Sequence, residues 1–246
     1  MTLRTMMAAL ATGGLLALSP VAFGSPALAA PDDKPAEAKP AEARPERPRA
    51  TRPPLDLANI RAAPVEVDRA AAVARANDWF NKADTMVGDF VQVGPDGRRS
   101  EGKIYVQRPG KLRFEYAQPA TMEIIADGTS VVIRDRKLAT QDSYFLAQTP
   151  LKFLLKDNID LTKDVRIEAV TGNAATTSIA VEDKATFGGT SHIKLMFDAK
   201  TFALKQWQVT DPQGYETLVS LFNIDLNKKP DPSLFRINQE RFLNPN

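Results

Sequence analysis

The sequence predicts a mainly β protein with a few helices: a single curved antiparallel sheet of about eleven strands. Apolar and polar residues alternate with a period of two over much of residues 86–224, which is typical of strands with one buried face. Turn signals separate these strands at short, regular intervals, which favours antiparallel neighbours over parallel strands joined by helices. One helical pattern precedes the strands and a second interrupts them, so we expect helices to cover one apolar face of the sheet.

Two segments are expected to precede the folded domain. Residues 1–29 resemble a signal peptide, because Arg4 precedes an apolar run that ends in the small-residue cleavage pattern Ala27-Leu28-Ala29. A membrane anchor is the alternative, but glycines and a Ser-Pro pair interrupt a run of marginal length. Residues 30–64 contain eight prolines among alanines and charged residues, which predicts an extended, solvated linker. The folded domain would then span residues 65–246.

The first element of that domain is a helix over residues 65–83, where Val73, Ala76, Phe80 and Ala83 recur on one face. The strands follow. Asp127-Gly128 is a strong hairpin signal between two of them. We expect strands at residues 86–93, 100–108, 111–116, 122–126, 131–133, 139–141, 165–170, 177–181, 191–197, 203–209 and 215–224.

A short helix is expected at residues 149–155, in the middle of the strands. Thr149 and Pro150 suit an N-cap and a first helical position, and Leu151, Leu154 and Leu155 would share one face. A twisted sheet of this size curls into an unclosed barrel, and short helices can cover such a barrel but cannot fill it. The space left would be an apolar cavity, the usual form of a small-ligand site. A sandwich with a filled core fits the alternation equally well, and both interpretations stay open.

The composition excludes several functional classes. The chain has 32 Lys and Arg against 30 Asp and Glu, which is no signature of nucleic-acid binding. It has no Cys and one His, which excludes disulfides, Cys-ligated metals and any site with two imidazoles. His192 lies on the polar face of a predicted strand, and no nucleophile elbow, phosphate loop or H-E-x-x-H motif is present. We therefore expect no enzyme, no catalytic residues, no cofactor and no metal site.

Arg108 stands out because the alternation places it on the apolar face with Ile104 and Val106, one residue before a proline. In one interpretation its stem lies on the sheet and its guanidinium reaches water. In the other, its forked donors reach across the cavity mouth to carbonyl groups of a lid helix. The pattern alone leaves both interpretations open.

Residues 101–119, EGKIYVQRPGKLRFEYAQP, resemble a strand pair of the LolA family of periplasmic outer-membrane lipoprotein carriers, with further similarity at Phe90-Val91-Gln92, residues 125–128 and Thr149-Pro150. The resemblance implies an unclosed β-barrel with a helical lid, a hydrophobic cavity for lipoprotein acyl chains, and a role for Arg108 in holding the lid closed. The expected cavity residues are Phe90, Ile104, Val106, Leu112, Phe114, Tyr116, Met122, Ile124, Val131, Ile133, Leu151, Leu154 and Leu155.

The same resemblance implies a periplasmic chaperone that shuttles lipidated proteins. It would receive them from an inner-membrane lipoprotein-releasing ABC transporter and pass them to an outer-membrane acceptor lipoprotein. We expect a monomer that is soluble after signal-peptide cleavage, because no Cys follows the apolar run to carry a lipid anchor. A lipid- or lipoprotein-sensing regulatory protein on the same fold is the alternative, and a hydrolase of periplasmic lipids is a third, weaker one.

Overall fold

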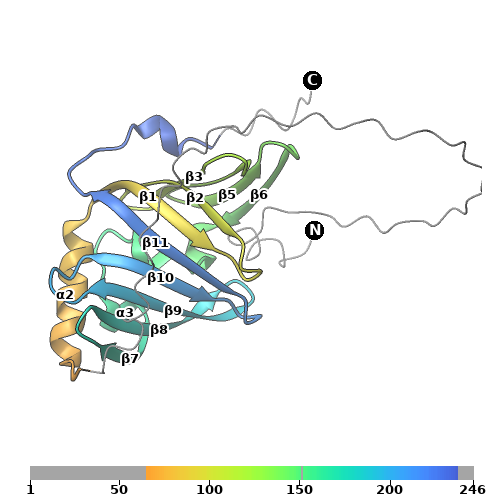
Figure 1. Ribbon diagram of the computed structural model, residues 1–246. Helices are drawn as coiled ribbons and strands as arrows, with labels where there is room; N and C mark the ends of the chain where they lie inside the picture. The colour runs from red at the N-terminus through yellow and green to blue at the C-terminus, as the bar shows by residue number, and fades with distance from the viewer. Residues whose placement is uncertain (1–64, 151, 238–246) are drawn as a thin grey trace, which may run out of the picture.

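The computed structural model describes residues 65–150 and 152–237 of the chain. The predicted signal peptide, the linker and Leu151 lie outside these described residues. Eleven strands form one antiparallel sheet, which confirms the predicted fold class (Figure 1). The strands are β1 (Thr85–Val93), β2 (Arg99–Gln107), β3 (Lys111–Tyr116), β4 (Met122–Asp127), β5 (Ser130–Asp135), β6 (Thr140–Phe145), β7 (Arg166–Gly172), β8 (Thr176–Thr186), β9 (Gly189–Asp198), β10 (Leu204–Thr210) and β11 (Glu216–Asp225).

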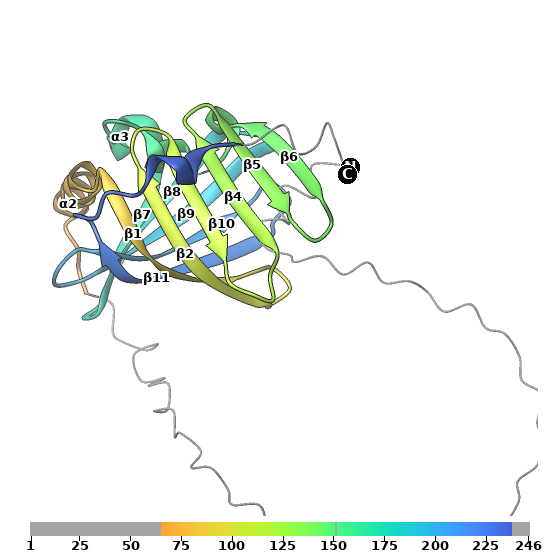
Figure 2. The same cartoon turned by 90° about the horizontal axis from the view of Figure 1, so that it is seen from above.

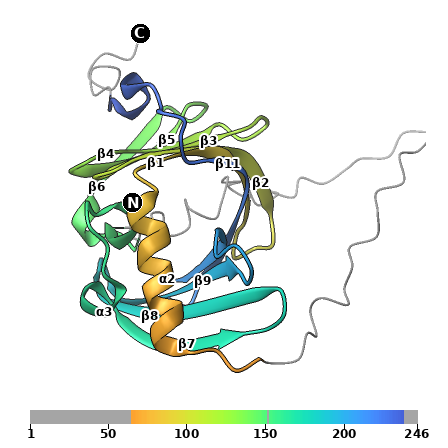
Figure 3. The same cartoon turned by 90° about the vertical axis from the view of Figure 1, so that its left-hand side faces the viewer.

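The order of the strands shows that the sheet is open. The order is β6-β5-β4-β3-β2-β1-β11-β10-β9-β8-β7, so the first and last strands pair in the middle. The two edges, β6 and β7, are consecutive along the chain. Figure 2 shows the half of the sheet with β4, β5 and β6 in front of the half with β8 and β9. In Figure 3 the two edges lie above and below one another, and the residues that connect them run between them on the left. We call these connecting residues, 146–150 and 152–165, the lid segment.

Helix α2 (Arg69–Lys82) lies across one end of the curved sheet (Figure 3). It begins four residues later than predicted because Asp68 is its N-cap and accepts hydrogen bonds from the backbone N–H groups of Ala70 and Ala71. Its buried face carries Ala72, Val73, Ala76 and Phe80, so the helical spacing in the sequence identified the correct face.

The lid segment contains three short turns of helix rather than the single helix expected at residues 149–155. They are η2 (Leu146–Gln148), η3 (Lys152–Leu155) and α3 (Leu161–Asp164). The hydroxyl and backbone N–H of Thr149 both donate to the carbonyl oxygen of Leu146, at 2.9 and 3.0 Å. Thr149 therefore closes η2 and does not cap the next helix.

The concave face of the sheet holds the main core, built around the aromatic side chains of Phe90, Phe114 and Trp207 together with those of α2. A second, smaller layer lies on the convex face. There, η4 (Pro232–Phe235) packs over β3 and β4, and Arg113 donates from Nη1 to the carbonyl oxygen of Leu234 at 3.1 Å. Ile125, Val132 and Phe235 are buried without belonging to the main core.

The N-terminal residues of the described part cover the free edge of β7. The backbone N–H of Val65 donates to the carbonyl oxygen of Gly172 at 2.9 Å, at one end of the strand. At the other end, Arg69 donates from Nη2 to the carbonyl oxygen of Ile167 at 2.8 Å. These contacts occupy hydrogen-bonding groups through which an open sheet edge recruits other strands.

Candidate functional site: an apolar cavity beneath the lid

A cavity of about 50 Å³ lies between the concave face of the sheet, the C-terminal half of α2 and η3. Apart from Arg108, every residue that lines it is apolar or aromatic. The lining consists of Trp79, Phe80, Ala83, Met86, Ile104, Val106, Arg108, Leu112, Phe114, Leu154, Leu155, Leu204 and Trp207.

The cavity is small, which indicates that α2 and the lid segment are closed over the sheet in this structure. A volume of about 50 Å³ holds about three to five water molecules, because one water needs roughly 10–15 Å³ of such space. A long acyl chain is several times larger than that. Of the two architectures that the alternation allowed, the structure has the open sheet, with a core largely filled by its own side chains. A ligand as long as an acyl chain would fit here only if α2 and the lid segment moved away from the sheet.

Six of the predicted cavity residues line the cavity: Ile104, Val106, Leu112, Phe114, Leu154 and Leu155. The others on β1, β3, β4 and β5 point to the same concave face and are buried in the main core, but they do not reach the cavity; these are Phe90, Tyr116, Met122, Ile124, Val131 and Ile133. Leu151 lies outside the described residues.

The sequence analysis missed the contribution of α2 and of β10 to the lining. Trp79, Phe80 and Ala83 come from the last turn of α2 and the residue after it. Phe80 and Ala83 carried a signal, since both belong to the helical face picked out by spacing. Leu204 and Trp207 come from β10, where an irregular register against β9 between Leu204 and Gln206 places them on the same side. A regular alternation would place Leu204 and Trp207 on opposite faces of the strand, because they are three positions apart.

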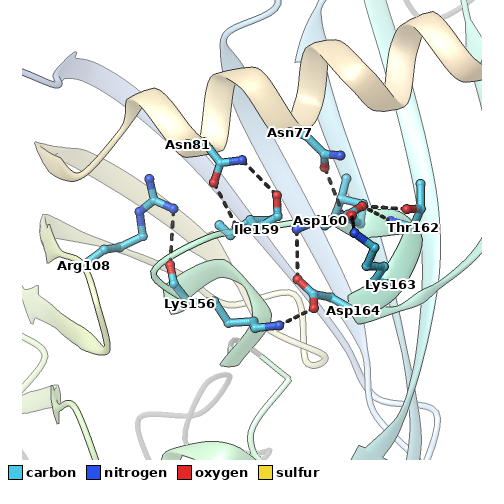
Figure 4. A network of polar contacts seen from close by, with 10 residues as sticks. Asn77, Asn81, Arg108, Lys156, Ile159, Asp160, Thr162, Lys163 and Asp164 are labelled. Carbon is cyan, nitrogen blue, oxygen red and sulfur yellow. Dashed lines mark hydrogen bonds and ion pairs between the residues drawn. The ribbon is translucent and has the colours of Figure 1, made fainter.

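Arg108 extends from the end of β2 to the helical elements that cover the cavity (Figure 4). Its Nε donates to the carbonyl oxygen of Ala83 at 3.1 Å, its Nη1 to that of Lys156 at 3.3 Å, and its Nη2 to that of Phe80. Nη2 also lies 3.3 Å from Oδ1 of Asp84. A single side chain from the sheet thus holds both the end of α2 and the lid segment.

The charge of Arg108 is buried at this junction. Its side chain is only 3% exposed. Burial lowers the pKa of the Arg108 guanidinium below its usual value, and the nearby carboxylates of Asp84 and Asp157 oppose that shift. An arginine stays protonated under such a shift at neutral pH, so the contacts to the carbonyl oxygens are charge-assisted hydrogen bonds.

Two asparagines one helical turn apart join α2 to the lid segment (Figure 4). Asn81 exchanges two hydrogen bonds with the backbone of Ile159, and Oδ1 of Asn77 accepts the N–H of Leu161 at 3.0 Å. Residues four apart share a helix face, so both side chains form hydrogen bonds with the backbone of residues 159–161. Helix α2 and residues 159–161 therefore form one hydrogen-bonded unit.

The lid segment is also fixed to the far side of the sheet. The Nζ atom of Lys152 lies 2.9 Å from Oδ2 of Asp183 and donates to the carbonyl oxygen of Ala185 at 2.8 Å. The Asp183 side chain is 4% exposed, so this is a largely buried ion pair. Arg108 and Lys152 hold the two ends of η3 against opposite parts of the curved sheet.

In residues 65–150 and 152–237, no cluster of three or more His, Cys, Asp or Glu side chains is arranged to hold a metal ion. His192 is half exposed, with its Nδ1 3.1 Å from Oε2 of Glu168. Among the same described residues, none of the helices has the length and apolar character needed to span a membrane.

The fold and the site together define an open β half-barrel that encloses an apolar cavity beneath a helix and a lid segment. The family model described as outer membrane lipoprotein carrier protein LolA matches residues 81–238, well over half of the chain. The chain belongs to the LolA family, as its resemblance to that family predicted.

Curated relatives agree with this assignment. An outer-membrane lipoprotein carrier protein of Chromobacterium violaceum is 28% identical over 188 residues, covering 74% of this chain and 90% of the relative. A protein with the same description from Nitrosomonas europaea is 29% identical over 182 residues, covering 70% and 87%. Among solved structures, a LolA superfamily protein from Nitrosomonas europaea covers 70% of this chain and 99% of that chain, at 10% identity and a TM-score of 0.41. The structure of MucB covers 72% and 66%, at 15% identity and a TM-score of 0.40.

Proposed function

We propose that this protein is a periplasmic carrier that holds the acyl chains of lipoproteins in the cavity beneath its lid. It would collect its cargo from an inner-membrane lipoprotein-releasing ABC transporter and deliver it to an outer-membrane acceptor lipoprotein. Membership of the LolA family and the description of the curated relatives support this role. The apolar lining supports the choice of ligand, because twelve of its thirteen residues have apolar or aromatic side chains.

A carrier of this kind solves a solvation problem. Each buried methylene contributes about 0.8 kcal/mol, so a long acyl chain left in water costs on the order of 10 kcal/mol. A protein that encloses the chain removes this cost during transit between membranes. Such a protein binds and releases its cargo, and it needs no nucleophile, metal or cofactor.

The observation that carries the proposal is the position of Arg108. Its guanidinium bonds α2 and the lid segment to the sheet directly over a cavity that is too small for the cargo. Loading must break these hydrogen bonds, and the closed state regains them on release. A contact that exists only in the empty state lowers the net affinity for cargo and favours delivery.

The test is the variant Arg108→Leu, expressed with a lipoprotein substrate. We expect the variant to copurify with lipoprotein and to fail to pass it to the acceptor, because nothing favours return to the closed state. The matched control is Arg166→Leu, which removes an arginine whose side chain is 69% exposed on β7. Transfer by Arg108→Leu at the wild-type rate would contradict the role of Arg108 in returning the protein to its closed state.

A second experiment separates the carrier from the alternative regulatory protein. Native mass spectrometry of the protein, purified from its own periplasm, shows what the cavity holds. A bound lipidated protein is expected for a carrier. A free lipid, together with capture of a regulatory partner instead of a transporter, would favour the sensor.

A further inference from the structure

The register of the three central strands divides the concave face into successive layers. Met86, Val106 and Leu112 are opposite one another in the layer next to Arg108. Ile104 and Phe114 form the following layer. Both layers contribute residues to the cavity lining, so the cavity extends from Arg108 along β2 toward the N-terminal end of that strand.

The third layer is different, because the central position is Gly102 and its neighbours are large. Phe90 of β1 and Tyr116 of β3 pair with Gly102 from either side. The ring centroids of Phe90 and Tyr116 are 5.1 Å apart at an interplanar angle of 86°, and Phe90 makes a similar edge contact with Phe114 at 4.9 Å. The two rings therefore pack against each other on either side of Gly102, where a Cβ would lie 2.0 Å from the carbonyl oxygen of Glu115 in β3.

A buried hydrogen bond fixes this third layer on the side that faces away from Arg108. The hydroxyl of Tyr116 donates to Oε1 of Gln92 at 2.8 Å, and both side chains are 3% exposed. Gln92 is a polar residue on the concave face, one step beyond Phe90 in the alternation of β1. Burial raises the pKa of Tyr116, so its hydroxyl stays a donor. A hydrocarbon that passed the rings would have to break this bond and leave an amide unpaired in an apolar setting.

We propose that Phe90, Tyr116 and Gln92, which lie behind the lining of the closed cavity, form the floor of the cavity once it opens and set the length of acyl chain that it accepts. This inference rests on the proposed carrier function and goes beyond it, because it assigns a specificity-determining role to residues outside the cavity lining. The chain enters beside Arg108, since the protein part of the cargo must stay outside, and its methyl end meets the floor.

The strand geometry gives the expected depth. Four residues separate Arg108 from Ile104, which is about 13 Å at roughly 3.3 Å per residue. An extended acyl chain advances about 1.3 Å per carbon, because each C–C bond of about 1.5 Å lies at an angle to the chain axis. Once α2 and the lid segment have moved away from the sheet, about ten carbons therefore fit above the floor. Removing the floor adds the two residues to Gly102, about 7 Å, or roughly five more carbons.

Binding of acyl chains of different length can be measured by the fluorescence of the protein's own tryptophans. Its two tryptophans, Trp79 and Trp207, both line the cavity. A brominated fatty acid that enters the cavity will therefore quench most of the tryptophan fluorescence. Unlabelled saturated fatty acids, from octanoic to stearic acid, can then be ranked by how well they displace it from the full mature chain.

For the wild type, we expect each added carbon to tighten binding about fourfold, the equivalent of about 0.8 kcal/mol per methylene, until the chain reaches the floor. Beyond that length the gain should stop. In Tyr116→Ala the length at which the gain stops should increase by up to about five carbons. Phe90→Leu is a milder floor variant and carries the test if Tyr116→Ala does not fold.

The matched control is Phe235→Ala, which truncates an aromatic side chain that is 3% exposed outside the main core. It should leave the limiting length unchanged. If a folded floor variant has the same limiting chain length as the wild type, the role of the floor is wrong, but the proposed carrier function is not affected. Failure of the wild type to bind any fatty acid would overturn the proposed function, and this inference with it.

Discussion

Asn81 of α2 satisfies both backbone hydrogen-bonding groups of Ile159 in the lid segment. Its Nδ2 donates to the carbonyl oxygen of Ile159 at 2.9 Å, and its Oδ1 accepts the N–H of Ile159 at 2.9 Å. An asparagine thereby takes the place of a neighbouring strand for this one residue. The lid of the half-barrel is therefore a composite of α2 and the lid segment, and Arg108 restrains both parts at once.

We predict that Asn81→Leu loosens this composite. The substitution leaves the N–H and C=O of Ile159 without partners, so the free energy of unfolding should fall by about 1–3 kcal/mol. Amide hydrogen exchange should accelerate in residues 156–164 and much less in β1 to β3. The control is Gln206→Ala, which removes a side-chain hydrogen bond to Ser220 elsewhere on the sheet. Equal acceleration throughout the sheet would contradict a local role.

The ion pair between Lys152 and Asp183 gives a second prediction. Lys152→Met leaves the Asp183 carboxylate buried without its cation, and the free energy of unfolding in urea should fall by about 3 kcal/mol, at the low end of the range for broken buried pairs because the Lys152 side chain is 20% exposed. The double variant Lys152→Met with Asp183→Asn should recover part of this loss.

The exposed pair of Lys103 and Asp89 is the matched control for this experiment. Its Nζ and Oδ1 atoms are 3.0 Å apart, but the two side chains are 60% and 40% exposed. Solvent screens such a pair, so Lys103→Met should cost at most about 1 kcal/mol. A similar loss for both single variants would show that burial at Asp183 does not matter.

Asp160 makes the start of α3 sensitive to acid. Hydrogen bonds from Thr162 and Lys163 to its carboxylate lower the pKa of Asp160 to about 2. The unfolded value is about 3.9, so the stabilisation is fully present above about pH 4 and is lost as the pH falls through the folded pKa. The difference in unfolding free energy between the wild type and Asp160→Asn should be constant above about pH 4 and shrink toward about pH 2. A difference that does not change with pH would exclude this cause.

The sequence predicted the sheet well because a strand with one buried face has alternating apolar and polar residues, a pattern visible within a few neighbouring positions. The alternation around Ile104 and Phe114 identified their shared face, and the structure has them opposite one another on the concave side. The hairpin at Asp127-Gly128 was predicted for the same reason, since a tight turn requires particular residues: Gly128 has φ of 112°.

The lid and part of the lining depend on contacts that no local pattern records. Thr149 suits a helix N-cap in sequence, yet its hydroxyl bonds backwards to Leu146. Leu204 and Trp207 share a face only because the register of β10 against β9 is irregular between them. The role of Asn81 in joining α2 to Ile159 requires the tertiary fold, because the two residues are 78 positions apart.

The path of the chain through the lid segment has a mechanical consequence. The segment leaves β6 at one border of the sheet and enters β7 at the other, so it is a strap fastened at both ends and not a hinged flap. A strap limits how far the two borders can separate. Its contour length therefore determines the girth of the largest cargo that the protein can surround, and an insertion between η3 and α3 would widen that limit without altering a single wall residue.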